Sequence, residues 1–319
     1  LFITEGSNDG TPEWIKGWQR HEPRLEVIGG RERRGKIEAI NRAMPYVRTP
    51  IVVFTDANTM LNRQALRNLV RHFEDRRVGA VAGEKRIEAL DTEAAAGAGE
   101  GLYWKYESWL KKLDTELHTV VGAAGELFAI RTELYQPVER DTLLDDFMIS
   151  LRIAAWGYRV VYEPNAYASE RPSFSISEEK KRKVRIAAGG FQAIGRLKPL
   201  LNPFRYGWLS FQYVSHRVMR WAVAPFCLPV LLVLNALLVL LPGQEGSLGR
   251  AFYAGAMGAQ VLFYGAAAVG HWYENRQLRM KAFFVPYYFW FMNYCALLGY
   301  QRYRRGHETG LWEKVKRAF

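Results

Sequence analysis

The chain has 319 residues, of which 49% are hydrophobic and 24% charged, so it is long enough for one large domain or two and can bury a core. Its formal net charge is +12, which raises the question of an anionic partner. Cys227 and Cys295 both lie in hydrophobic blocks, and the six histidines form no metal-ligand spacing. This pattern suggests neither a disulfide framework nor a zinc site.

Up to about Ala168, short apolar runs alternate with amphipathic stretches, which predicts an α/β fold built from βα units around a parallel sheet. The runs predict strands at residues 1–4, 25–28, 51–55, 78–82 and 158–162. The amphipathic stretches predict helices at residues 11–19, 36–44, 64–73, 102–113 and 146–156.

The segment IVVFTDAN, residues 51–58, is a continuous apolar run that ends abruptly in polar side chains. Such a run predicts a central strand buried on both faces, and ligands of open α/β sheets bind beyond the carboxyl ends of such strands. Asp56 and Asn58 therefore form a candidate site for a hard cation such as Mg²⁺ or Mn²⁺, which prefers oxygen ligands. The alternative interpretation is that these two side chains cap a turn or a helix.

The segment TLLDDFMISLRIAAWGYRVVYEP, residues 142–164, places Asp145 and Asp146 at the head of an apolar helix that Gly157 ends. One aspartate in that position is ordinary capping and complements the helix dipole. Two adjacent aspartates exceed what capping needs, so one of them is a candidate general base.

Three weaker motifs have ordinary explanations when each is taken alone. The stretch SNDGT, residues 7–11, contains Asp9 in what reads as a turn. In RRGKIEAIN, Gly35 and Lys36 stand at a helix start that could hold phosphate, although the spacing is not that of a P-loop. In HTVVGAAGELFAIR, the small residues 122–125 would let backbone approach a ligand closely.

The C-terminal third is hydrophobic in three blocks, which predict membrane spans at about 222–241, 251–270 and 283–300 within a membrane region 222–303. A basic amphipathic stretch, residues 201–221, predicts a helix in the membrane interface, and a basic tail follows at 304–319. The basic clusters could instead mark nucleic-acid binding, but beside hydrophobic blocks they favour anionic lipids and no nucleic acid. The positive-inside tendency predicts that the third block lies partly in the interface or re-enters.

Taken in order, SNDGT, GKIEAIN, TDAN, GAAGELFAIR, DD-x₄-LR-x₄-GY-x₃-YEP and a basic R-x-x-R before the membrane blocks resemble a membrane-embedded family 2 glycosyltransferase with the GT-A fold. The resemblance is to the polysaccharide synthases of that family, and it covers nearly the whole chain. It implies a catalytic GT-A domain over residues 1–200, of which the first βα unit of the family is missing.

The resemblance also implies roles for particular residues. It implies that Asp9 contacts the nucleotide base and that Lys36 lies near the nucleotide. Asp56 matches the first aspartate of the metal-binding D-x-D motif, and Asn58 stands in place of the second. A further pair of expectations is that Asp146 is the general base and that Asp145 replaces the acid that precedes it.

The R-x-x-R segment matches the Q-x-x-R-W segment of processive synthases, so Arg185, with Arg182, is expected near the donor diphosphate. Arg182 replaces the usual glutamine and Ile186 the usual tryptophan, which leaves processivity open.

These implications converge on an inverting transfer from a UDP-sugar, with Mg²⁺ or Mn²⁺ as cofactor, to a growing polysaccharide at the cytoplasmic face of the cell membrane. The alternative is addition of a single sugar to a lipid-linked acceptor, and product length separates the two. A basic membrane adaptor without enzymatic activity would explain the charge but would leave Asp56, Asp145 and Asp146 without a role.

Overall fold

The computed structural model describes residues 1–30, 32–87, 95–170, 176–241, 247–275 and 281–306. These residues form two compact units. The sheet unit consists mainly of Leu1–Lys85 and Thr115–Ala168, and the helical unit mainly of Arg86–Asp114 and Ser169–Arg305.

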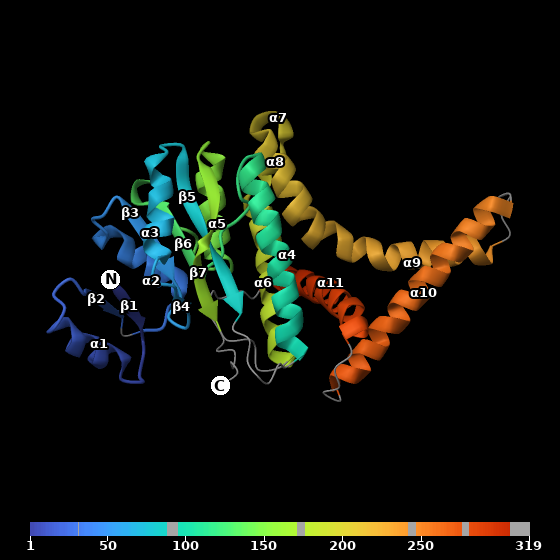
Figure 1. Ribbon diagram of the computed structural model, residues 1–319, viewed down its shortest axis with the longest axis horizontal. Coiled ribbons are helices and arrows are strands. Elements are labelled where there is room, and N and C mark those ends of the chain that lie inside the picture. The colour runs from blue at the N-terminus through green and yellow to red at the C-terminus, as the bar shows by residue number, and fades with distance from the viewer. Residues whose placement is uncertain (31, 88–94, 171–175, 242–246, 276–280, 307–319) are drawn as a thin grey trace. The chain divides into compact units, whose positions relative to one another are not determined.

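The sheet unit contains two separate β-sheets (Figure 1). In the first, β1 (Phe2–Glu5) and β2 (Val27–Gly30) pair in parallel, and α1 (Thr11–Gln19) connects them. The second has five strands in the order β3-β6-β5-β7-β4. These strands are β3 (Ile51–Thr55), β4 (Met60–Leu61), β5 (Val78–Ile87), β6 (Leu127–Arg131) and β7 (Arg159–Glu170).

The helices of the sheet unit are short and follow the expected positions. They are α2 (Lys36–Ala43), α3 (Ala65–Val70) and α5 (Asp145–Ala155). Single 3₁₀ turns lie at Met44–Tyr46, Arg71–Glu74 and Thr132–Leu134. The buried side chains of α3 and the turn after it, Ala65, Leu69 and Phe73, pack with Leu127 and Ala129 of β6 to form a core on one face of the sheet.

The expectation that residues 51–55 form a central strand of a parallel sheet, buried on both faces, is wrong. β3 is the end strand of the five-stranded order, it is half-buried, and it pairs antiparallel with β6, with Thr55 opposite Leu127. Its apolar residues still have partners on both faces, because Val53 packs against the α3 core while Phe54 stacks on Phe128 with ring centroids 4.6 Å apart. A continuous apolar run therefore does not identify a central strand, because an edge strand can also contact apolar groups on both faces.

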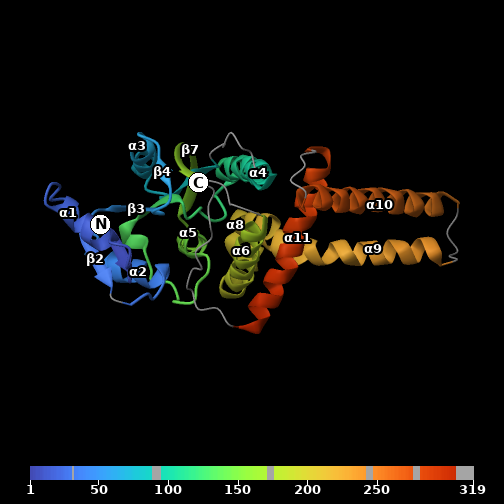
Figure 2. The ribbon, with the colours of Figure 1, turned by 90° about the horizontal axis from the view of Figure 1, so that it is seen from below.

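The helical unit begins with α4 (Ala95–Leu117) and continues with α6 (Ile176–Arg196), a 3₁₀ turn at Lys198–Leu201 and α7 (Pro203–Tyr206). α8 (Trp208–Tyr213), a π-helical segment (Val214–Val223) and α9 (Ala224–Leu240) then follow without a break. α10 (Ser247–Asn275) packs against α9 (Figure 2), and α11 (Lys281–Arg305) is the last described helix.

In the described part of the chain, two helices are long and apolar enough to cross a membrane, Trp208–Leu240 and Gly249–Tyr273. Residues 208–221 of the expected interfacial stretch and the expected first span are therefore one continuous helix, whereas residues 201–207 precede it in a 3₁₀ turn and α7. The third hydrophobic block is not among these two. It forms α11, which packs along α6 and buries Tyr287, Phe291 and Cys295 against Ile176 and Val184. The expectation that the third block lies in the interface or re-enters stays a prediction.

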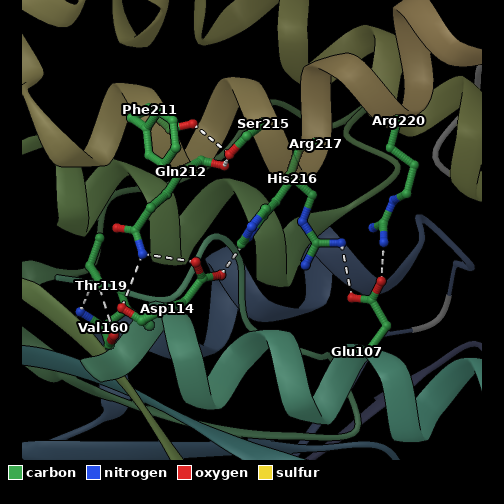
Figure 3. A network of polar contacts seen from close by, with 10 residues as sticks. All are labelled: Glu107, Asp114, Thr119, Val160, Phe211, Gln212, Ser215, His216, Arg217 and Arg220. Carbon is green, nitrogen blue, oxygen red and sulfur yellow. Dashed lines mark hydrogen bonds and ion pairs between the residues drawn. The ribbon is translucent and has the colours of Figure 1, made fainter. Parts of the chain in front are cut away.

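A row of polar contacts joins α4 to the helix Trp208–Leu240 (Figure 3). This polar seam consists of Glu107 and Asp114 on α4 with Gln212, His216, Arg217 and Arg220 opposite. Asp114 accepts a hydrogen bond from Gln212 Nε2 at 2.8 Å, and its other oxygen lies 3.0 Å from His216 Nδ1. Glu107 pairs with both arginines. Burial by itself raises the pKa of Glu107, but Arg220 and Arg217 outweigh burial and hold this pKa well below its ordinary value.

Candidate functional site

Acidic side chains from separate elements of the sheet unit gather around one lysine. Lys36 is the first residue of α2, Asp56 follows directly after β3, and Asp145 and Asp146 form the first turn of α5. Glu126 precedes β6, and its backbone carbonyl accepts a hydrogen bond from Thr55 at the end of β3. We call these five residues, Lys36, Asp56, Glu126, Asp145 and Asp146, the carboxylate cluster.

Lys36 bridges two of the aspartates that the sequence singles out. Its Nζ lies 2.9 Å from Asp56 Oδ1 and 3.3 Å from Asp145 Oδ2. Asp145 is 5% exposed in its side chain, whereas Lys36 and Asp56 are half-buried and reach solvent. The sequence motifs GKIEAIN, TDAN and DD are therefore brought together, which sequence spacing alone could not establish.

The cluster changes the protonation behaviour of its members. Burial by itself lowers the pKa of Lys36, but the carboxylates of Asp145, Asp56 and Asp146 outweigh burial and raise this pKa, so the ammonium stays charged. Burial raises the pKa of Asp56, and the contact with Lys36 opposes that rise. The site thus holds one firmly protonated cation among several carboxylates.

The pKa of Asp146 is raised well above that of an ordinary carboxyl group. Burial, and then the negative charge of neighbouring Asp145, raise its pKa to about 7, although Lys36 acts in the opposite direction. The backbone comes close to it at Gly125, where an added Cβ would lie 3.3 Å from Asp146 Oδ2 and 3.5 Å from Lys36 Nζ. Gly125 therefore forms one wall of the cluster, and close approach of the turn at 122–125 to a ligand stays a prediction.

Sequence reasoning assigned no role to a second ion pair, between Lys85 and Glu126. Lys85 lies in β5, its side chain is completely buried, and its Nζ donates to Glu126 Oε1. Glu126 also adds negative charge at Asp56 and Asp146, where it raises the pKa of each. The sequence signal for this contact is weak. A lysine in the largely apolar segment VGAVAGEKRI needs a charged partner only if its side chain is buried rather than pointing to solvent.

Asn41 is a further residue that the sequence did not single out, and it fixes α2 to the chain ahead of α5. Its Nδ2 donates to Val138 O at 2.9 Å, and its Oδ1 accepts from Tyr135 Oη at 2.6 Å and from Val138 N at 3.3 Å. Asn41 lies on the same helix as Lys36. This clamp therefore sets where α2 presents Lys36.

Asp9 and Asn58 lie in the sheet unit, and both are exposed to solvent. Asp9 is exposed, and its Oδ1 accepts a hydrogen bond from the backbone N–H of Thr11 at 3.2 Å at the start of α1, which is the turn interpretation. Asn58 is exposed in the short segment between β3 and β4. Contact of Asp9 with a nucleotide base stays a prediction.

Arg182 and Arg185 lie on α6, in the helical unit. Arg182 is nearly buried and pairs at 2.9 Å with Glu179, a carboxylate that also lies 3.5 Å from Lys183 Nζ. Arg182 is thus held inside its own unit by a neighbour one helical turn away. Contact of Arg182 and Arg185 with a donor diphosphate stays a prediction.

The residues present fit a divalent cation that is completed by ligands from outside the protein. Asp56 supplies a carboxylate that reaches solvent, and Asn58 can supply an exposed amide oxygen. Among the residues that the structure describes, no three His, Cys, Asp or Glu side chains form a group able to hold a metal alone. One or two protein oxygens that leave room for phosphate and water are the usual arrangement for Mg²⁺ in nucleotide sites.

Comparison with known proteins gives concordant results. Residues 1–137 match the family model described as Glycosyl transferase family 2. The chain is 24% identical over 204 residues to a poly-beta-1,6-N-acetyl-D-glucosamine synthase of Staphylococcus aureus, covering 61% of this chain and 48% of that protein. The synthase of the same name from Staphylococcus epidermidis is 21% identical over 242 residues, which cover 74% of this chain and 58% of that one. The chain thus spans about half the length of these curated relatives.

Among solved structures, the mannosyltransferase PcManGT from Pyrobaculum calidifontis, in complex with GDP-Man and Mn²⁺, is similar in fold. The match has a TM-score of 0.65 and 23% sequence identity, and it covers 96% of this chain and 77% of that one.

Proposed function

We propose that the protein is a glycosyltransferase that transfers a sugar from a nucleotide-diphosphate donor to an acceptor hydroxyl with inversion at the anomeric carbon. Its GT-A fold and the match of residues 1–137 to the family model described as Glycosyl transferase family 2 support this proposal. The observation that carries this proposal is the carboxylate cluster, in which Lys36 bridges Asp56 and Asp145 beside Asp146.

Asp146 acts as the general base. Its ionised carboxylate takes the proton of the acceptor hydroxyl as that oxygen attacks the anomeric carbon, and the bond from that carbon to the diphosphate oxygen breaks. A pKa raised to about 7 suits this task, because a base is most effective when its pKa lies near the working pH. Asp145 keeps the pKa of Asp146 raised through its negative charge and is held in place by Lys36.

The donor diphosphate binds beside Lys36 and Asp56. A divalent cation, Mg²⁺ or Mn²⁺, bound by Asp56 with Asn58 would supply positive charge against the charge that develops on the leaving diphosphate. The ammonium of Lys36 adds to that charge and reaches solvent from the N-terminus of α2, where free backbone N–H groups also favour phosphate. Asp9 contacts the nucleotide base, and Arg182 and Arg185 assist at the diphosphate.

The donor is a UDP-sugar, with UDP-N-acetylglucosamine as the first candidate, and the product is a growing polysaccharide made at the cytoplasmic face of the cell membrane. Two facts support this choice, the name of the synthases that the chain resembles and the two helices that are able to cross a membrane. In this proposal, residues 1–200 form the catalytic domain, 201–221 lie in the interface, and 222–303 form the membrane region.

One observation favours the second candidate, addition of a single sugar to a lipid-linked acceptor. Arg182, which stands where processive synthases have glutamine, is engaged by Glu179, and Ile186 stands where they have tryptophan. Neither side chain then offers the contact with a polymer that the synthase segment provides.

The test is an assay of the full chain, extracted in detergent, with labelled UDP-N-acetylglucosamine and GDP-mannose in the presence of Mg²⁺ or Mn²⁺. Asp146→Asn should abolish transfer and leave UDP binding within about twofold, because the amide cannot take the proton but preserves shape. Asp141→Asn, at an exposed acid just ahead of α5, is the matched control and should keep activity. Transfer retained in Asp146→Asn refutes the base assignment, and the length of the labelled product separates the two candidates.

A further inference from the structure

The positive charge that lies next to Asp56 in the structure is the ammonium group of Lys36. Lys36 Nζ donates a hydrogen bond to Asp56 Oδ1 at 2.9 Å, and Asp56 is the one carboxylate of the TDAN segment. A divalent ion at Asp56 would lie next to this ammonium. Like charges a few ångströms apart repel strongly even in a partly solvated site, so the two cations compete for the same carboxylate.

The surroundings of Lys36 favour its retention while no ligand is bound. Its Nζ has a second carboxylate, that of Asp145, at 3.3 Å, and Asp145 is almost fully buried. The backbone from which Lys36 projects is fixed by the clamp that Asn41 forms with Tyr135 and Val138. Asn58 contributes no negative charge that could favour a divalent ion over the lysine.

A nucleotide diphosphate changes this balance. The side chain of Lys36 is 28% exposed and carries a flexible four-carbon stem, so its ammonium can turn toward incoming phosphate while α2 stays in place. That movement would free Asp56 Oδ1, and the phosphate oxygens would complete the coordination of the metal. Departure of the lysine and arrival of the metal would then both depend on the nucleotide.

We propose that Lys36 is a resident cation that excludes a divalent ion from Asp56 until a nucleotide diphosphate draws its ammonium away, so that metal and nucleotide bind cooperatively. This inference rests on the proposed function, since it takes a nucleotide diphosphate as the ligand. It adds an order to the binding steps, because appreciable metal binding requires the nucleotide.

The test measures Mn²⁺ binding to the full chain in detergent by the loss of the free-ion electron paramagnetic resonance signal, with and without UDP. UDP should raise the Mn²⁺ affinity of the wild-type chain, after correction for Mn²⁺ bound by UDP itself. Lys36→Met should bind Mn²⁺ at least about tenfold more tightly than wild type in the absence of UDP, because a positive charge next to the ion is removed. Lys16→Met, at an exposed lysine of α1, should match wild type.

Two further variants test whether the gain in Mn²⁺ affinity comes from the lost charge of Lys36 and from binding at Asp56. Lys36→Arg keeps the charge and should keep Mn²⁺ excluded, a result that does not depend on Lys36→Met being well folded. Combining Lys36→Met with Asp56→Asn should remove the gain in affinity. The proposal is overturned if Lys36→Met binds Mn²⁺ no more tightly than wild type, if the double variant keeps the gain, or if wild type binds Mn²⁺ equally well without UDP.

Each of these readouts is independent of catalysis. Absence of sugar transfer together with the expected Mn²⁺ affinities would refute the proposed function and leave the role of Lys36 intact.

Discussion

Glu107 on α4 and Arg217 on the helix Trp208–Leu240 face each other at 3.2 Å, and Arg220, one turn further along, donates to the other oxygen of the same carboxylate. Glu107 is 3% exposed, so one buried carboxylate pairs with two guanidinium groups. Together with Asp114, it attaches α4 to a helix that is able to cross a membrane.

Replacing Glu107 should destabilise the helical unit. Glu107→Gln removes the carboxylate charge that pairs with the partly buried Arg217 and Arg220, and removal of one partner of a buried ion pair costs on the order of 3 kcal/mol. The measurement is the thermal unfolding of the purified chain in detergent, followed by circular dichroism. Glu116→Gln, at an exposed position of the same helix, is the control and should leave the midpoint unchanged. Equal midpoints for the two variants would show that the polar seam contributes nothing to stability.

The raised pKa of Asp146 predicts the pH dependence of the reaction. Below about pH 7 the carboxyl group of the free enzyme is protonated and cannot accept the acceptor's proton, so kcat/KM should rise with pH through that region and level off above it. The measurement is kcat/KM for the sugar donor across pH 5.5 to about 8.5 at saturating Mg²⁺. A profile that is flat across this range would contradict Asp146 as the base.

The same shift predicts how stability depends on pH. The folded-state pKa of Asp146 lies above the unfolded value, so the native state binds the proton more tightly, and the free energy of unfolding falls as pH rises between the two values. Asp146→Asn cannot ionise and should lack this slope, so the variant should gain stability over wild type at pH 8 relative to pH 5. Chemical denaturation of the apo protein at both pH values measures this difference. An identical pH dependence in both proteins would show that the pKa of Asp146 is not raised.

A methyl group at Gly125 should disturb the site more than the fold. Its Cβ would stand 3.3 Å from Asp146 Oδ2, which is tight, and 3.5 Å from Lys36 Nζ, which is ordinary contact. Gly125→Ala should therefore lower kcat about tenfold or more by displacing the base, since small misplacements of catalytic groups are costly. Gly17→Ala on α1 meets nothing within 4 Å and is the control. If the two variants have the same kcat, the wall formed by Gly125 does not position Asp146.

Much of the site could be predicted from the sequence, because its parts have local signals. The polar residues after an apolar strand indicated Asp56, and two aspartates at a helix head indicated Asp145 and Asp146. The pairing of Lys36 with Asp56 could not be predicted, because it depends on how α2 packs. Nor could the edge position of β3, since its partner β6 lies more than 70 residues away and nothing in IVVFT specifies an antiparallel neighbour.

The contact of Lys85 with Glu126 had the weakest signal of all, because a lysine near the end of an apolar strand usually points to solvent. In the structure, Lys85 is buried and Glu126 accepts its hydrogen bond. Glu126→Gln removes a carboxylate charge that pairs with this ammonium, which should lower the free energy of unfolding by roughly 3 kcal/mol. Denaturant titration of the full chain in detergent measures the loss.

Glu126→Gln should also lower the pKa of Asp146 and so change the pH profile of the reaction. Glu126 raises the pKa of Asp146 by its negative charge, so Glu126→Gln should shift the rise of kcat/KM to lower pH while the maximum rate at high pH persists. Glu133→Gln, at an exposed position after β6, is the matched control for both measurements. A loss of stability without any shift of the pH profile would make Glu126 solely a partner of Lys85. A shift of the profile would make Glu126 part of the electrostatic environment that sets the base.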